Sequence, residues 1–231
     1  MIDQDKVKGF WDARAQAYQE LPFESIANLE QDAENLQLKI ELETKKIFDW
    51  LGNISGKNIL DLGAGVGQWS FRFAEKGASV VAVEYSDPLA EIGRKEAEKR
   101  GVNNLKFITS SAEDFKPEVS FDIVFISGLF VYMNDDQAIK FMKNLPLSCN
   151  KNTIVVLRDG TGIKERHEIN NKFSEHLKVP YSATYRNREE YLQLFSNAGF
   201  TLIKDENMFD EGCVLNKYNE TRLRVFLFKV S

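Results

Sequence analysis

Residues 58–69 read Asn58-Ile59-Leu60-Asp61-Leu62-Gly63-Ala64-Gly65-Val66-Gly67-Gln68-Trp69, a short apolar run that leads into three glycines at alternate positions. The apolar residues predict a strand that is covered on both faces. The glycines allow a tight backbone turn that can approach a bound molecule closely, because no Cβ atom stands in the way. After this turn the apolar residues follow a helical period up to Gly77, so residues 67–76 are expected to form a helix.

A second strand is expected at residues 79–84, which are apolar and β-branched and end in the carboxylate of Glu84. A strand, a glycine turn, a helix and a second strand form a nucleotide-binding βαβ unit. An acid about 20 residues beyond the turn can accept hydrogen bonds from ribose hydroxyls. The glycine spacing differs from the dinucleotide pattern G-x-G-x-x-G, because Asp61 precedes a D-x-G-x-G-x-G run. Asp61 would repel a pyrophosphate and would suit a ligand that carries an ammonium or sulfonium group.

Residues 59–67 resemble motif I of the class I S-adenosylmethionine (SAM) methyltransferases. Two more segments are similar to that family: residues 111–115, which follow a third expected strand at 105–109, and the expected strand at 121–128. The resemblance implies that Glu84 binds both ribose hydroxyls, that residues 111–115 contact the adenine, and that the strand end at Ser127 faces the methionine part. These matches weigh against the alternative, a tight turn in some other α/β protein. The implied cofactor-binding residues in these segments are Asp61, Gly63, Gly65, Gly67, Glu84, Tyr85, Ala112, Glu113 and Ser127.

Residues 1–56 precede the glycine motif and are expected to form an N-terminal helical lid over the cofactor. Residues 10–18 are similar to an N-terminal element of many small-molecule methyltransferases. That resemblance implies that Tyr18 reaches the methionine carboxylate of SAM, and Lys39 on the next helix is the candidate for a basic residue that assists. The alternative is that the aromatic residues of this segment only pack the helix onto the sheet.

The rest of the chain alternates expected strands with expected helices. This pattern predicts an α/β fold: a doubly wound, mainly parallel seven-stranded sheet with an antiparallel last strand and helices on both faces. No helix is expected between the last two strands, at 200–203 and 222–230, which agrees with a hairpin return. We therefore expect one methyltransferase domain over residues 1–231, with the lid at 1–56, a SAM-binding half at 57–158 and a substrate-side half at 159–231.

The connection that follows the fifth expected strand, residues 158–186, is longer than the ~2–6 residues typical of such a link. It leaves the carboxyl ends of the strands, where open α/β sheets bind ligands, so it is expected to form the acceptor wall. Three arginines in it are candidates to hold a carboxylate or phosphate on the acceptor, unless they are simply solvated. They are Arg158, Arg166 and Arg186.

His167 in this connection is the candidate catalytic base. Methyl transfer needs a base only if the acceptor must lose a proton, as a hydroxyl must, and histidine titrates near neutral pH. The alternative is a surface histidine on a polar helix. His176 and Asp159 share this ambiguity.

Composition excludes several classes of function. The formal net charge is -5 with acids and bases interspersed, which argues against a dedicated nucleic-acid-binding surface. The two cysteines lack metal-type spacing, the first residues lack an apolar signal core, and no apolar run approaches the ~18 residues needed to span a bilayer. We expect a cytoplasmic protein without membrane insertion and without a metal site.

The sequence thus predicts a SAM-dependent methyltransferase that modifies a small-molecule or saccharide acceptor, at oxygen rather than nitrogen, and releases S-adenosylhomocysteine (SAH). One alternative is a protein methyltransferase. Residues 155–159 and 185–186 faintly resemble the protein N-terminal methyltransferases, but the acidic cluster that those enzymes use to bind a peptide amine is absent here. A domain that binds SAM without catalysis is the other alternative.

Overall fold

The computed structural model describes residues 1–16, 21–175 and 177–231. Its main sheet has seven strands in the order β3-β2-β1-β4-β5-β9-β8. Neighbouring strands are parallel from β3 through β5, and β9 runs antiparallel to both β5 and β8. The predicted sheet with its antiparallel last strand is confirmed. The strands are β1 (Asn58–Leu62), β2 (Ser79–Glu84), β3 (Leu105–Thr109), β4 (Phe121–Ser127), β5 (Cys149–Gly162), β8 (Phe200–Asn207) and β9 (Thr221–Val230).

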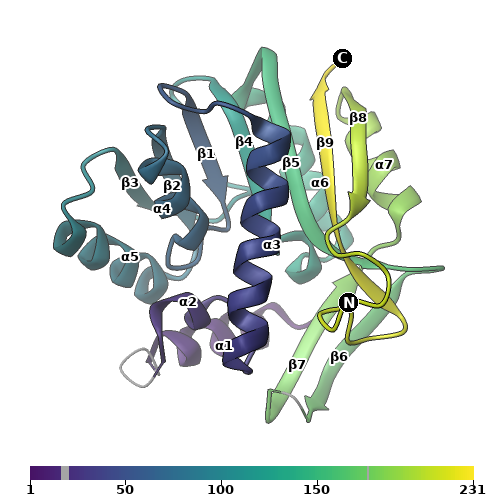
Figure 1. Cartoon of the computed structure of the whole chain (residues 1–231). Helices are drawn as coiled ribbons and strands as arrows, with labels where there is room; N and C mark the ends of the chain where they lie inside the picture. The colour runs from purple at the N-terminus through teal and green to yellow at the C-terminus, as the bar shows by residue number, and fades with distance from the viewer. Residues whose placement is uncertain (17–20, 176) are drawn as a thin grey trace.

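Helices cover both faces of this sheet (Figure 1). On one face α3 (Ala33–Leu51), α4 (Gln68–Glu75) and α5 (Asp87–Arg100) bury side chains such as Ile47 and Phe73 against Ile59 and Phe125. The other face is covered by α6 (Asp135–Asn144) and α7 (Arg188–Asn197). Phe141 of α6 packs there against the alternate residues of the same strands. Strands buried on both faces read as continuous apolar runs, which is why the sequence pattern was clear.

Local signals set where the helices begin. The side chain of Asn187 accepts a hydrogen bond from the backbone N–H of Glu190, 2.9 Å away, and the Glu190 carboxylate accepts one from the backbone N–H of Asn187 at 2.8 Å. This reciprocal capping box satisfies two backbone donors at the start of α7. Asn134 and Gln137 form the same arrangement at the start of α6.

The connection after the fifth strand differs from the prediction. β5 continues to Gly162 because it pairs with β9 from Ile154, opposite Lys229, to Gly162, opposite Thr221. Two further strands follow, β6 (His167–Ser174) and β7 (Val179–Tyr185), which form a separate antiparallel hairpin. The alternative of a polar helix at His167 is therefore wrong, because His167 is the first residue of β6.

This hairpin and the N-terminal helices lie at one end of the sheet. Figure 1 shows α1 (Gln4–Gln16), α2 (Phe23–Ile26) and the β6–β7 hairpin beyond the carboxyl ends of the parallel strands. Short 3-10 helices η2 (Phe130–Tyr132) and η3 (Leu145–Ser148) flank α6. The elements outside the main sheet thus gather where open α/β sheets bind ligands.

Candidate functional site

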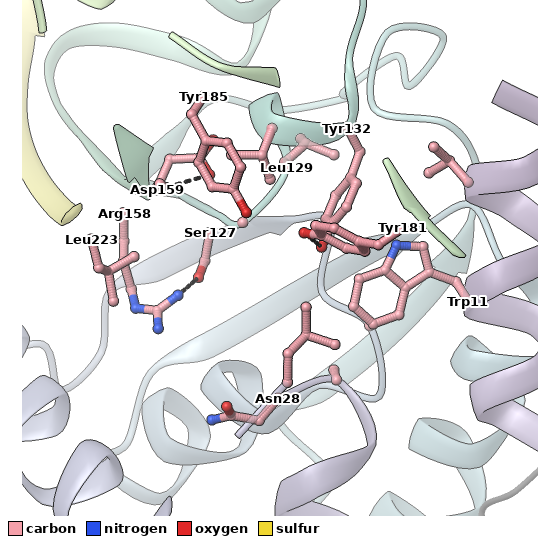
Figure 2. Close-up of a pocket in the computed structure, with 18 of the residues that line it drawn as sticks. Trp11, Asn28, Ser127, Leu129, Tyr132, Arg158, Asp159, Tyr181, Tyr185 and Leu223 are labelled. Atoms are coloured by element: carbon pink, nitrogen blue, oxygen red, sulfur yellow. Dashed lines mark hydrogen bonds between the residues drawn. The ribbon is translucent and has the colours of Figure 1, made fainter. Parts of the chain in front are cut away.

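A cavity of about 710 Å³ lies at the carboxyl ends of the parallel strands. Residues of the glycine turn and of the following loops line one part of it, and residues of α1, η2 and the β6–β7 hairpin line another. Figure 2 shows the second part, with Trp11, Tyr132, Tyr181 and Tyr185 around a common space. Ligand pockets for small molecules typically have volumes of about 300–1,000 Å³, so the cavity has the size of a small-molecule site.

The glycine turn forms the floor of the cavity beside β1. Gly63, Gly65 and Gly67 all have left-handed backbone conformations, with φ values of 75°, 58° and 88°. A Cβ atom on Gly65 would lie 2.9 Å from the Cβ of Ala27, which belongs to the N-terminal segment. The turn and this segment therefore approach each other as closely as a glycine permits.

Gly67 has a different role from its two neighbours. It does not line the cavity, and a Cβ atom there would lie 2.4 Å from the ring of Phe107. Gly93 in α5 makes room for the same ring. Packing of α4 and α5 against β3 thus accounts for Gly67, whereas Gly63 and Gly65 line the cavity.

The Glu84 carboxylate is buried at the end of β2, next to the turn. One oxygen accepts a hydrogen bond from the backbone N–H of Gly65 and the other accepts one from that of Ser86, each at 2.8 Å. Burial raises the pKa of Glu84. The two amides fix the carboxylate in place, and each oxygen keeps a lone pair for a hydroxyl donor.

Asp61 is buried deeper in the turn. Its carboxylate accepts a hydrogen bond of 2.6 Å from the Ser70 hydroxyl of α4, and burial raises its pKa to about 7. Because Asp61 lines the cavity, a cationic group of a ligand can approach it there. Such a group would favour the ionised carboxylate and lower its pKa again.

Tyr85, Ala112 and Glu113 lie together along the same part of the cavity. The hydroxyl of Tyr85 is buried, and among the described residues it has no hydrogen-bond partner. Burial raises its pKa, so the phenol is a neutral donor at physiological pH. A buried donor without a partner costs free energy, and a ligand atom in the cavity would remove that cost.

Charged residues gather where β4 and β5 end. Arg158 donates a 2.9 Å hydrogen bond to the Ser127 hydroxyl and forms an ion pair with Glu43 of α3. Lys39, also on α3, donates to the side-chain oxygen of Asn28 at 2.9 Å, and burial lowers the pKa of its ammonium group. All of these residues line the cavity. Tyr18, the other residue expected near the methionine carboxylate, lies outside the described residues.

Aromatic side chains form the opposite wall. The hydroxyls of Tyr132 and Tyr181 are 2.9 Å apart, and the rings of Trp11 and Tyr132 meet edge to face with centroids 5.4 Å apart. Tyr181 and Tyr185 are four residues apart in β7, so their side chains lie on the same face of that strand. Their hydroxyls point into the space seen in Figure 2. Burial raises the pKa of all three phenols, which are therefore neutral hydrogen-bonding groups.

His167 lines the cavity beside this wall, with its ring centroid 6.0 Å from that of Tyr185. Asp159 lies behind Tyr185 and is fully buried. Its carboxylate accepts hydrogen bonds from the Tyr191 hydroxyl at 3.2 Å and from the Gly160 N–H at 2.9 Å. His176 lies outside the described residues. Of the candidate bases, His167 is thus the more exposed to the cavity.

The buried carboxyl of Asp159 gives a testable pH dependence. Burial raises its pKa to about 7, above the ~3.9 of an unfolded aspartate, so the folded chain holds the proton more tightly than the unfolded chain. This group therefore lowers the free energy of unfolding as pH rises from about 4 to 7, by at most about 1.4 kcal/mol per pH unit. Asn lacks the titration, so we expect the Tm of Asp159→Asn relative to wild type to increase between pH 5 and pH 8 in calorimetric scans. A difference in Tm that stays constant with pH would contradict the raised pKa.

Two of the three arginines proposed to bind an anion on the acceptor do not line the cavity. Arg186 is buried and donates to the carbonyls of Phe130 and Met133 and to Asp135. Arg166 also binds Asp135. The expectation for Arg166 and Arg186 is therefore wrong, because each guanidinium is directed at a protein carboxylate, and only Arg158 lines the cavity.

Sequence reasoning missed Tyr132 and Glu43. Tyr132 follows β4 in a 3-10 turn, and Glu43 sits within a helix whose other polar residues are mostly solvated. Neither residue is part of a motif. No local pattern could have assigned them to the cavity, since their partners Tyr181 and Arg158 are distant in the chain.

The described part of the chain contains neither a metal centre nor a membrane-spanning helix. Residues 1–16, 21–175 and 177–231 contain no group of three or more histidine, cysteine, aspartate or glutamate side chains arranged to hold a metal ion. Within the same residues, no helix combines the length and apolar character that a bilayer crossing requires.

Comparison with known proteins identifies the fold family. A family model described as a methyltransferase domain matches residues 59–150. Phosphoethanolamine N-methyltransferase 1 of Caenorhabditis elegans is 26% identical over 189 residues, which cover 78% of this chain and 38% of that protein. A cephaeline 6'-O-methyltransferase of Carapichea ipecacuanha is 25% identical over 218 residues, 90% of this chain and 58% of that protein. The chain thus spans 38% and 58% of the lengths of these two relatives.

Solved structures agree in fold. DhpI in complex with SAH superposes with a TM-score of 0.69 at 16% identity, over 99% of this chain and 97% of that one. The glycopeptide N-methyltransferase MtfA complexed with SAM gives a TM-score of 0.64 at 13% identity, over 82% of this chain and 93% of that one. At such identities the likeness concerns the fold alone. The matched family model places a methyltransferase domain at residues 59–150, and the solved structures show that the chain has the fold of SAM-dependent methyltransferases.

Proposed function

We propose that the protein transfers a methyl group from SAM to an oxygen atom of a small-molecule, sugar-like acceptor. The observation that carries this proposal is that one cavity of about 710 Å³ contains both the glycine turn with Glu84 and the wall of tyrosines. A donor and an acceptor bound in one cavity can be held in line, and such positioning supplies most of the catalytic advantage in a displacement at a methyl carbon.

In this proposal the donor lies along the turn. Gly63 and Gly65 permit close approach, the Glu84 carboxylate accepts hydrogen bonds from the ribose hydroxyls, and Tyr85, Ala112 and Glu113 surround the adenine. Asp61 faces the amino group of the methionine part. Ser127 and Lys39 lie nearest its carboxylate, and Lys39 suits that role because its buried ammonium donates to the neutral side chain of Asn28. Tyr18 remains a predicted partner of the same carboxylate.

The acceptor lies against the tyrosines. Neutral phenol hydroxyls both donate and accept hydrogen bonds, and aromatic rings supply apolar contact area, a combination that suits a polyhydroxyl compound. SAM, when bound, supplies the electrophilic methyl group on its sulfonium. The acceptor oxygen forms the new bond to carbon, the carbon–sulfur bond breaks with its electron pair left on sulfur, and the imidazole of His167 takes the proton of the acceptor hydroxyl.

This assignment predicts a large effect at His167. We expect His167→Ala to lower kcat by about 100-fold or more, the usual scale for loss of a positioned base, with the Kd for SAM within twofold of wild type. Turnover would be measured by SAH release against a panel of methyl glycosides, sugar phosphates, phenols and primary amines. Asn170→Ala in the same strand is the matched control, because Asn170 does not line the cavity. An unchanged kcat in His167→Ala would remove it as the base.

An amine acceptor is a second candidate, favoured by the aromatic wall. Ammonium groups bind over the faces of tyrosine and tryptophan rings, and among the described residues no arginine or lysine lies over the rings of Trp11, Tyr132, Tyr181 or Tyr185. The relative in Caenorhabditis elegans is named as an N-methyltransferase. Methylation of the amines in the panel, but not of the glycosides or phenols, would replace the oxygen proposal.

The two remaining alternatives are separated by the same measurements. Tight SAM binding by calorimetry without turnover of any compound would support a SAM-binding domain without catalysis. Methylated peptide N-termini would support a protein methyltransferase. The absence of a nucleic-acid partner and a cytoplasmic location stay predictions from composition.

A further inference from the structure

The β6–β7 hairpin carries one wall of the cavity, yet it is separate from the main sheet. β7 contributes Tyr181 and Tyr185 to the cavity, and β6, most of whose residues are exposed, contributes His167. The two strands form a sheet of their own, and an isolated two-stranded hairpin is at best marginally stable in water. Contacts outside the pair must therefore fix how the wall sits over the cavity.

One carboxylate binds the two residues that flank this hairpin in the sequence, at the end where β6 begins and β7 finishes. Arg166, just before β6, donates to Asp135 Oδ2 at 2.8 Å and also to Oδ1. Arg186, just after β7, donates to Asp135 Oδ1 at 2.6 Å. Asp135 is the first residue of α6, on the main body, and the hydrogen bond from Arg166 lowers its pKa to about 2. The carboxylate is therefore ionised under physiological conditions.

Arg186 also binds η2, the other element that carries a tyrosine of the cavity wall. Its side chain is only 3% exposed and donates to the carbonyls of Phe130 at 2.8 Å and Met133 at 2.9 Å. Phe130 is the first residue of the η2 turn, which carries Tyr132, and Met133 directly follows the turn. The same guanidinium thus sets the turn and the end of β7 relative to each other, and the 2.9 Å contact between the Tyr132 and Tyr181 hydroxyls depends on that alignment.

We propose that Asp135, which lies outside the cavity, is a positioning residue for the acceptor: with Arg166 and Arg186 it fixes the tyrosine wall against which the acceptor binds. The consequence for catalysis rests on the proposed methyl transfer. A displacement of the wall by about 1 Å would disturb an aligned acceptor strongly, since errors of that size can cost 100-fold in rate. SAM should be affected little, because none of its proposed contacts lies on the hairpin or on η2.

The test compares Asp135→Asn with Asp136→Asn, its exposed neighbour on the same helix. For Asp135→Asn we expect the KM for the best compound in the panel to rise at least tenfold, with the Kd for SAM within twofold of wild type. With both proteins saturated with SAM, we expect the backbone amides of Val179 and of residues 181–185 to exchange with solvent at least tenfold faster in Asp135→Asn than in wild type. Asp136→Asn should match wild type in all three. Arg186→Lys, which cannot reach both carbonyls and the carboxylate, should act like Asp135→Asn.

Three results would overturn the inference: unchanged amide exchange in β7, an unchanged KM for the acceptor despite faster exchange, or a loss of SAM affinity as large as the loss of acceptor affinity. A wild-type protein that binds SAM but methylates nothing in the panel would instead refute the proposed methyl transfer. The exchange comparison would then still decide whether Asp135 fixes the hairpin.

Discussion

Gly65→Arg is expected to weaken SAM binding at least 100-fold, about 2.8 kcal/mol, in a chain that still folds. Gly65 has a φ of 58° and lines the cavity. An arginine there would be strained in the left-handed region, its Cβ would lie 2.9 Å from the Cβ of Ala27, and its long side chain would compete with the ligand for space. Titration calorimetry with SAM and with SAH measures the loss, and circular dichroism checks the fold.

Gly101→Arg is the matched control for this substitution. Gly101 ends α5 with a φ of 67°, and a Cβ atom there would meet nothing within 4 Å. The control therefore carries the same backbone strain and the same added charge, away from the cavity. Wild-type affinity in folded Gly65→Arg would show that the turn does not bind the cofactor. Equal losses in both variants would point to general destabilisation.

Glu84→Ala should weaken SAM by about 1.5–3 kcal/mol, the scale of a hydrogen bond to a charged group, which corresponds to roughly 10–150-fold in Kd. The carboxylate also accepts from the amides of Gly65 and Ser86, so part of any loss could come from those unpaired donors. A ligand comparison separates the two causes. SAH and its 2′-deoxyribose analogue are titrated into both proteins.

If Glu84 binds the ribose, the wild-type protein will prefer SAH over the deoxy analogue, and Glu84→Ala will bind the two with similar affinity. Glu84→Gln keeps the shape of the side chain without its charge. Its preference for SAH over the deoxy analogue should lie between those of wild type and Glu84→Ala. A loss of SAM affinity below half a kcal/mol in Glu84→Ala would contradict ribose binding. So would a preference for SAH that survives the substitution.

The part of the cavity proposed to hold the methyl donor could be located from the sequence, because its residues are neighbours in short segments. The strand, the turn and the following helix are consecutive, and the parallel pairing of β1 with β2 and β4 brings Glu84 and Ser127 to the same edge. The exception is Gly67, which matches the motif but packs against Phe107. A glycine in a sequence motif indicates only that no Cβ atom is tolerated at that position. Whether a ligand or a protein side chain occupies the space depends on the neighbours in the folded structure.

The part of the cavity proposed to hold the acceptor depends on contacts between distant segments. Tyr132 meets Tyr181, Arg158 meets Glu43, and Arg186 reaches back to the turn after β4. The hairpin itself escaped prediction because β6 is exposed and polar, without the apolar alternation that marks a half-buried strand. Residues 158–186 were expected to form the acceptor wall, but two of the arginines expected there to bind an anion, Arg166 and Arg186, donate to Asp135 instead.

The sequence by itself determined the sheet, its antiparallel last strand and the glycine turn with its carboxylates, since apolar periodicity and glycine spacing act within a few residues. The tertiary structure alone decided which side chains face the proposed acceptor and which support them. Those outcomes depend on where the hairpin, the N-terminal helices and the turn after β4 come together. Packing and charge pairing across long stretches of chain fix that meeting point, and no local pattern encodes it.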